Sequence, residues 1–130
     1  MTDKPYLLAV DDEPDILDFL ERVFRRHYVV LRAGDADQAV EVLAETPARV
    51  LVSDQRMPGR SGLELLEDVS RSHPEITRIL LSGFSDLPEI TQAAESGLVH
   101  AYVVKPVDSK RLLEAVQEAR TRHEKGDWQR

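Results

Sequence analysis

Short apolar runs alternate along the chain with longer stretches in which apolar residues recur every three or four positions. The runs contain four to six residues and are bounded by turn-forming residues, which indicates strands rather than helices. Nearly continuous apolar runs of this kind are typical of strands that are covered on both faces. We predict five such strands, at Tyr6–Val10, Tyr28–Leu31, Val50–Ser53, Ile76–Leu81 and Ala101–Val104.

A helix is predicted after each strand. Pro14 suits the first turn of the first helix, because the N–H that proline lacks has no partner there. Asp35 with Gln38, and Ser61 with Glu64, resemble capping boxes at the starts of the second and third helices. The remaining helix boundaries are marked by Pro88 at the start of the fourth helix, Gly97 at its end, and Ser109 as the cap of the fifth.

Five consecutive strand–helix units predict a parallel sheet with helices on both faces. Because crossovers are right-handed, few arrangements remain. The expected fold class is α/β: a three-layer (βα)5 flavodoxin-like domain with strand order 2-1-3-4-5. Ligands of such sheets bind beyond the carboxyl ends of the strands where the strand order reverses, here between the first and third strands. Asp11, Asp12 and Asp54 lie at the ends of those two strands.

Composition narrows the class of protein. The 130 residues suffice for one domain with one core, and 42% hydrophobic and 32% charged residues suit a soluble globular chain. No apolar run approaches the roughly 20 residues needed to cross a bilayer, and no signal peptide is visible. We therefore expect a cytoplasmic protein that does not bind membranes.

Two further properties exclude other functions. The chain has no cysteine, so disulfides, thiolate zinc sites and cysteine nucleophiles are excluded. Its formal net charge of −7 repels nucleic acid, so we expect no direct nucleic acid binding by this domain. The four histidines, His27, His73, His100 and His123, show no ligand spacing, and no metal role is expected for them.

Polar residues follow the apolar runs at the positions where parallel strands end at one edge of the sheet. Aspartates follow the first and third runs, Ser82 ends the fourth, and Lys105 follows the fifth. Crowded carboxylates repel one another, and Mg²⁺, which prefers hard oxygen ligands, relieves this repulsion. A carboxylate can also act as the nucleophile that forms an aspartyl phosphate, with a lysine and a hydroxyl to contact the phosphoryl oxygens.

This pattern resembles the receiver domain of two-component response regulators over nearly the whole chain, from about Tyr6 to Arg122. The residues that carry the resemblance are Asp11-Asp12, Asp54, Met57-Pro58-Gly59, Ser82-Gly83, Tyr102 and Lys105-Pro106. Each motif alone is weak, but their order and their positions at strand ends make the combination specific. The resemblance implies a receiver domain at residues 1–125, with residues 126–130 as a tail or the start of a linker to an output domain.

The resemblance also implies a role for each residue of the site. Asp54 would accept a phosphoryl group from a phosphohistidine on a sensor histidine kinase or a phosphotransfer protein. Asp12, Asp54 and the backbone carbonyl of Arg56 would bind Mg²⁺ directly, with Mn²⁺ as a possible substitute, and Asp11 would act mainly through a bound water. Lys105 would pair with the phosphoryl group, and the peptide before Pro106 would be cis. The protein would assist its own phosphorylation and dephosphorylation and turn over no external substrate.

A conformational switch is implied as well. Ser82 would move toward the phosphoryl oxygen and Tyr102 would turn inward behind it, which reshapes the face formed by the fourth helix, fifth strand and fifth helix. That face would mediate homodimerisation or partner docking. Arg56 and Phe84 occupy positions that influence dephosphorylation in this family, and their bulk predicts a long-lived phosphoform. The arginines of the first helix (Arg22, Arg25 and Arg26) form either a solvated face or a kinase contact.

Three alternative functions differ in their sequence requirements. A Mg²⁺-dependent phosphatase with an aspartyl-phosphate intermediate usually has two aspartates two positions apart after the first strand, followed by a threonine, and this chain lacks that pattern. A degenerate receiver would lack site residues that are present here. A flavin-type electron carrier would need phosphate-binding residues after the first strand, where the acidic run of Asp11–Glu13 repels phosphate.

Overall fold

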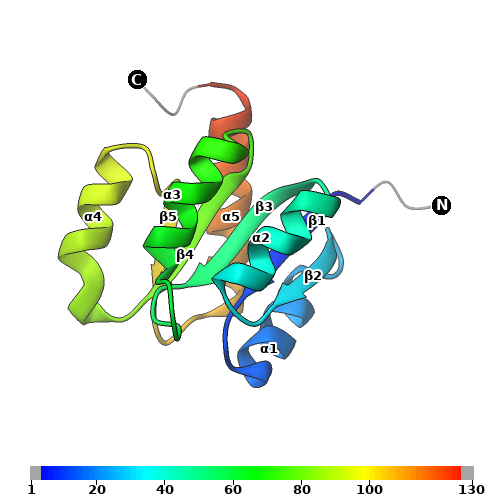
Figure 1. The fold of residues 1–130 in the computed structure, drawn as a ribbon, viewed down its shortest axis with the longest axis horizontal. Coiled ribbons are helices and arrows are strands. Elements are labelled where there is room, and N and C mark those ends of the chain that lie inside the picture. The colour runs from blue at the N-terminus through cyan, green and yellow to red at the C-terminus, as the bar shows by residue number, and fades with distance from the viewer. Residues whose placement is uncertain (1–3, 127–130) are drawn as a thin grey trace.

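The computed structural model describes residues 4–126, which form a five-stranded parallel sheet between two layers of helices (Figure 1). The strand order β2-β1-β3-β4-β5 is the predicted one. The strands are β1 (Tyr6–Val10), β2 (Val29–Ala33), β3 (Ala48–Asp54), β4 (Thr77–Ser82) and β5 (Ala101–Val104). The helices are α1 (Pro14–Phe24), α2 (Ala36–Glu45), α3 (Gly62–Ser72), α4 (Leu87–Glu95) and α5 (Ser109–Glu124), with a short 3-10 turn at Phe84–Asp86.

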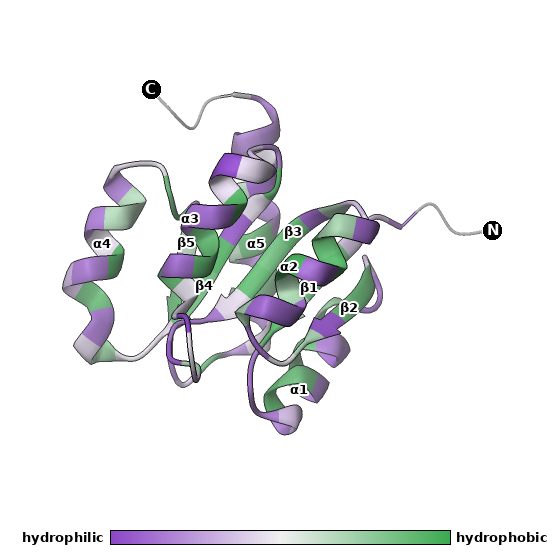
Figure 2. Ribbon diagram, viewed as in Figure 1, coloured by the Kyte–Doolittle hydropathy of each residue, from purple (hydrophilic) through white to green (hydrophobic). Residues whose placement is uncertain are grey.

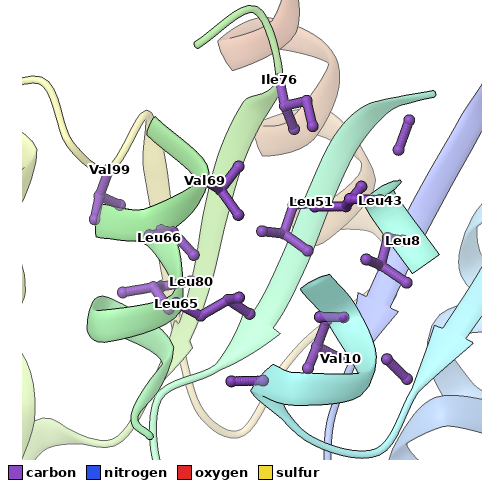
Figure 3. Close-up of a cluster of buried hydrophobic side chains, with 14 of the residues drawn as sticks. Leu8, Val10, Leu43, Leu51, Leu65, Leu66, Val69, Ile76, Leu80 and Val99 are labelled. Atoms are coloured by element: carbon purple, nitrogen blue, oxygen red, sulfur yellow. The ribbon is translucent and has the colours of Figure 1, made fainter. Parts of the chain in front are cut away.

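Alternation of side chains along the strands produces two separate cores. Leu8 and Leu51 pack under α2 and α3, with α4 at the margin (Figure 3). Leu7 and Val50 point to the opposite face and pack under α1 and α5. Figure 2 shows the strands as the hydrophobic centre of the molecule, whereas the helices carry hydrophilic residues among their hydrophobic ones. Burial on both faces explains why the strands appear in the sequence as unbroken apolar runs.

The predicted second strand was misplaced at both ends. Tyr28 precedes β2, because its N–H donates to the Phe24 carbonyl at 2.9 Å and so completes the turn after α1. Its ring is 3% exposed and packs edge-on against Phe24, with ring centroids 6.0 Å apart. The hydroxyl of Tyr28 accepts a hydrogen bond from Arg120 at 3.3 Å, which ties this ring to α5. The strand itself extends to Ala33, beyond the predicted end.

The two predicted capping boxes differ in the structure. Ser61 and Glu64 form the complete motif, in which the Glu64 N–H donates to the Ser61 hydroxyl and the Ser61 N–H donates to the Glu64 carboxylate. Asp35 accepts from the Gln38 N–H at 2.8 Å, as expected. The Gln38 side chain, however, accepts from the N–H of Gly34 rather than from that of Asp35, so this cap is not a capping box.

The cap of α5 was predicted one residue too late. Asp108, not Ser109, is the N-cap, and its carboxylate accepts from the Arg111 N–H at 2.9 Å. Adjacent Asp and Ser are both good caps, so the sequence did not distinguish them. Pro14 begins α1 and Gly97, with a φ of 87°, follows α4, both as predicted. None of the helices within residues 4–126 is long and apolar enough to cross a membrane.

Gly62 allows α3 to begin directly against the end of β3. Its N–H donates to the Gln55 carbonyl at 2.9 Å. A Cβ atom at this position would lie 2.4 Å from the Asp54 carbonyl oxygen and 2.7 Å from a methyl group of Leu80. Only glycine therefore permits this approach without displacement of the backbone at Asp54.

Candidate functional site

Three aspartates meet at the carboxyl ends of the two central strands. Asp11 and Asp12 follow β1 directly, and Asp54 ends β3, which pairs with β1 in parallel register. One carboxylate oxygen from each residue lies within 4.8 Å of those of the other two. Asp11 and Asp54 are buried, at 1% and 4% exposure, whereas Asp12 is exposed. The topology thus brings together residues that are far apart in the sequence.

The Asp11 carboxylate is the most perturbed acid of this cluster. One of its oxygens accepts from the Glu13 N–H at 2.9 Å, but the buried Oδ2 has no hydrogen-bond partner among residues 4–126. The pKa of Asp11 is raised to about 6, mainly by burial and then by the nearby charge of Asp54, whereas the Glu13 N–H and Lys105 act in the opposite direction. A buried carboxylate oxygen without a partner, beside two more carboxylates, fits a site for a hard divalent cation.

Lys105 completes the charge arrangement. Its Nζ lies 2.6 Å from Oδ1 of Asp54, so the amine pairs with this carboxylate. The Lys105 N–H donates to the Ser82 carbonyl at 2.8 Å, which holds the segment after β5 against the end of β4. The Lys105–Pro106 peptide is cis, as the resemblance implies.

Ser82 and Tyr102, the residues expected to switch, differ in burial. Ser82 is the last residue of β4 and is buried, and its hydroxyl donates to the neighbouring Gly83 carbonyl at 2.7 Å. Tyr102 lies on β5 opposite Leu80 and is 37% exposed. The Ser82 hydroxyl therefore has a local partner, and the Tyr102 ring reaches solvent.

Arg56 forms an ion pair that the sequence did not predict. Its guanidinium donates to both carboxylate oxygens of Asp86, at 3.2 and 3.0 Å, and to the Ser85 hydroxyl at 3.4 Å. Asp86 is the N-cap residue of α4, but its side chain caps no helical N–H. The pair connects the loop after Asp54 to the turn after Ser82, while Phe84 in that turn is 74% exposed.

A groove between α1 and α5 is bordered by two of the three arginines predicted for the first helix, although only Arg22 lies within α1, which ends at Phe24. Arg22 and Arg26 line this groove, which has a volume of about 530 Å³, together with Phe19 of α1 and Lys110 and Leu113 of α5. Apolar and cationic side chains thus occur side by side on this surface. The sequence identified the arginines, but the apolar part of the groove depends on the packing of α1 beside α5.

Comparisons with known proteins agree with this geometry. Residues 7–117 match the family described as the response regulator receiver domain. The hydrogenase transcriptional regulatory protein HoxA of Cupriavidus necator is 37% identical over 120 residues, which cover 92% of this chain and 25% of HoxA. The chain therefore spans only about a quarter of that relative.

Solved structures agree as well. The signal receiver domain of an HD domain-containing protein from Pseudomonas fluorescens Pf-5 is 32% identical, with a TM-score of 0.85 and coverage of 98% of this chain and 94% of that one. A CheY-like response regulator receiver domain protein from Methanospirillum hungatei JF-1 is 27% identical, with a TM-score of 0.85 and coverage of 95% and 99%.

Proposed function

Because this chain belongs to the response regulator receiver domain family of two-component systems, we propose that Asp54 accepts a phosphoryl group from a phosphohistidine of a sensor histidine kinase or phosphotransfer protein. The observation that carries this proposal is the cluster of Asp11, Asp12 and Asp54, one of whose carboxylates pairs with Lys105. Of the three aspartates, Asp54 is the one whose carboxylate contacts the Lys105 amine.

The donor set fits Mg²⁺, or Mn²⁺ in its place. Asp12, Asp54 and the backbone carbonyl of Arg56 would bind the cation directly, and Asp11 would act through a bound water. When bound, the cation supplies positive charge that offsets the negative charge of the phosphoryl oxygens. The buried Oδ2 of Asp11, which lacks a hydrogen-bond partner within the described part of the chain, supports this assignment.

The chemistry requires little beyond positioning and charge. A carboxylate oxygen of Asp54 attacks phosphorus in line, the P–N bond of the phosphohistidine breaks, and its electron pair stays on the imidazole nitrogen. The Lys105 ammonium, paired with Asp54 before the reaction, then contacts a phosphoryl oxygen. The Ser82 hydroxyl exchanges its bond with the Gly83 carbonyl for one with another phosphoryl oxygen.

We propose that this exchange couples phosphorylation to the face formed by α4, β5 and α5. Tyr102, which is partly exposed on β5, turns inward when Ser82 moves, and the face then mediates homodimerisation or partner docking. Phosphorylation shifts the equilibrium between the outward and inward positions of Tyr102 only by the free energy with which the phosphoryl group favours the inward one. The groove between α1 and α5, with Arg22 and Arg26 beside apolar residues, suits the kinase.

We place the receiver at residues 1–125 and assign residues 126–130 to a tail or the start of a linker, although Asp127–Arg130, including Trp128, lie outside the described residues. The similarity to HoxA, a transcriptional regulatory protein, favours a transcriptional output for the protein that contains this receiver. Such a protein would act in the cytoplasm. Family membership argues against the phosphatase alternative.

Labelling with a small phosphodonor tests the assignment of Asp54. Incubation with acetyl phosphate and Mg²⁺ is expected to add one phosphoryl group, located on Asp54 by mass spectrometry and absent from Asp54→Ala. Asp15→Asn, which changes an exposed carboxylate in the first turn of α1, is the control and is expected to label normally. Labelling of Asp54→Ala at the wild-type level would disprove the proposal.

A second prediction concerns the lifetime of the phosphoform. Arg56 lies two residues after Asp54 and is held by Asp86, so we expect it to hinder the water that hydrolyses the aspartyl phosphate. Asp86→Ala is expected to free the guanidinium and shorten the lifetime severalfold, measured as loss of label after removal of the donor. Ser85→Ala removes only the longer contact and is expected to change little. Loss of the wild-type label within seconds would contradict this prediction.

A further inference from the structure

A buried cation lies at the end of the sheet opposite the aspartate cluster. Arg78, near the start of β4, is 6% exposed, and among residues 4–126 no carboxylate pairs with it. Its guanidinium donates instead to four backbone carbonyls: Leu98 at 2.9 Å, Ile76 at 3.1 Å, and Pro74 and Gly97 at 3.3 Å. Two of these carbonyls follow α3 and two follow α4, so one side chain joins the two turns.

His100 is held against this cation by its backbone and its ring. The His100 N–H donates to the Arg78 carbonyl, and Nδ1 of His100 accepts from the Arg78 N–H, both at 2.8 Å. Because Nδ1 accepts this bond, it carries no proton and the ring is neutral. A guanidinium nitrogen of Arg78 also lies 3.4 Å from Nε2 of His100. Burial and the charge of Arg78 lower the pKa of His100 to about 3, which agrees with a neutral ring.

His123 brings the end of α5 to the same place. It lies in the last turn of α5, and its ring stacks on that of His100 with centroids 3.9 Å apart and planes inclined by 31°. Nδ1 of His123 is 3.0 Å from the hydroxyl of Thr77, the residue before Arg78. Two of the four histidines that are scattered in the sequence, His100 and His123, thus form a stacked pair.

The turn after α4 and the end of α5 lie at the same end of the molecule. Figure 1 shows the end of α5, in red, at the same end of the molecule as the yellow segment that leads from α4 to β5. Of the residues of α4, only Ile90 is buried, so this helix is held by few apolar contacts and can shift at low cost. The turn after α4 is nevertheless bound to Arg78 through Gly97 and Leu98.

We propose that Arg78, His100 and His123, here called the basic junction, couple the C-terminal end of α4 to the C-terminal turn of α5. A displacement of α4 moves the carbonyls that Arg78 binds, and Arg78 and His100 pass this displacement to the ring of His123. The position of the last turn of α5 therefore depends on α4. The inference relies on the proposed function only for the source of the displacement, and the coupling itself exists in the unphosphorylated protein.

Hydrogen exchange of the unphosphorylated protein, followed by mass spectrometry, tests the coupling. His123→Ala is expected to accelerate amide exchange about fivefold in the last turn of α5 and also at Gly97 and Leu98 after α4, whose carbonyls bind Arg78. Thr121→Ala is the control, because this exposed hydroxyl bonds only within α5. An effect of His123→Ala confined to α5 would overturn the proposal.

The reverse direction is tested through the packing of α4. Ile90→Val loosens α4 and is expected to accelerate exchange in the last turn of α5 in the wild-type background but not further in His123→Ala. If Ile90→Val accelerated exchange in the last turn of α5 equally in both backgrounds, the proposed coupling through the basic junction would be wrong. A third measurement compares exchange with and without acetyl phosphate. If Asp54 takes no label, the proposed function fails, whereas the first two measurements still decide the junction.

Discussion

Replacement of Asp11 by asparagine is expected to raise the free energy of unfolding at pH 7, without divalent cations, by about 2–3 kcal/mol. The pKa of Asp11 is about 6 in the folded protein against a model value of 3.8, so its ionisation at pH 7 opposes folding. Asparagine removes this cost and keeps an oxygen that can accept from the Glu13 N–H. Denaturant unfolding of both proteins measures the difference.

The pH dependence of this difference has a definite sign. A raised pKa means that the folded state binds protons more tightly, so the stability contributed by Asp11 is present below the unfolded pKa and is lost as the pH rises through about 6. The advantage of Asp11→Asn is therefore expected to shrink as the pH falls and nearly to vanish near pH 3 (about one unit below the unfolded pKa). Mg²⁺ is expected to stabilise the wild type more than the variant.

Asp15→Asn serves as the control for this prediction, because Asp15 is exposed in the first turn of α1. It is expected to change stability by no more than about 0.5 kcal/mol. A lower stability of Asp11→Asn than of the wild type at pH 7 without cations would refute the interpretation of the Asp11 pocket as a site of electrostatic strain.

The second large effect is acid destabilisation through His100. Its pKa is lowered from 6.5 to about 3, mainly by burial and then by the charges of Arg78, His123 and Arg122. The folded state therefore binds fewer protons than the unfolded state, and the stability contributed by neutral His100 is lost as the pH falls below about 6.5. Between pH 7 and pH 5 this loss is about 2 kcal/mol.

A variant isolates this contribution from the opposing one of Asp11. Asparagine at position 100 presents an amide oxygen near the position of Nδ1, so it keeps an acceptor for the Arg78 N–H but does not titrate. His100→Asn is expected to be less stable than the wild type at pH 7, because the stack with His123 is lost. The deficit is expected to shrink by about 2 kcal/mol at pH 5.

Denaturant unfolding at the two pH values measures this change, with His27→Asn as the control. His27 is exposed, so this control replaces a histidine by asparagine without touching the buried site of His100. If the free energies of unfolding of His100→Asn and the wild type differed by the same amount at pH 7 and at pH 5, His100 would not stay neutral when buried.

The residues that could be predicted from the sequence are those whose placement follows from strand ends. Asp11, Asp12, Asp54 and Lys105 each follow or end an apolar run, and a parallel sheet brings such positions to one edge. Strand order followed from the same pattern, because buried strands separated by helices leave few topologies. Local chemistry was sufficient for the capping box at Ser61.

The contacts that were missed depend on turns and tertiary packing. Arg56 and Asp86 are 30 residues apart and meet only because the loops after β3 and β4 lie side by side. His123 meets Thr77 across 46 residues through the placement of the end of α5 against the start of β4. Tyr28 has a side chain that favours strands, but its contacts with Phe24 and Arg120 place it before β2.

Strand β4 carries a member of each functional region at its two ends. Ser82 lies at the edge of the sheet that carries the aspartate cluster, and Arg78 lies in the basic junction, within a strand of six residues that is about 20 Å long. Side chains of a strand alternate between faces, so an insertion of one residue inside β4 would rotate one end relative to the other by half a turn. A gene library that varies segment lengths must therefore leave this strand intact and place its insertions in the loops.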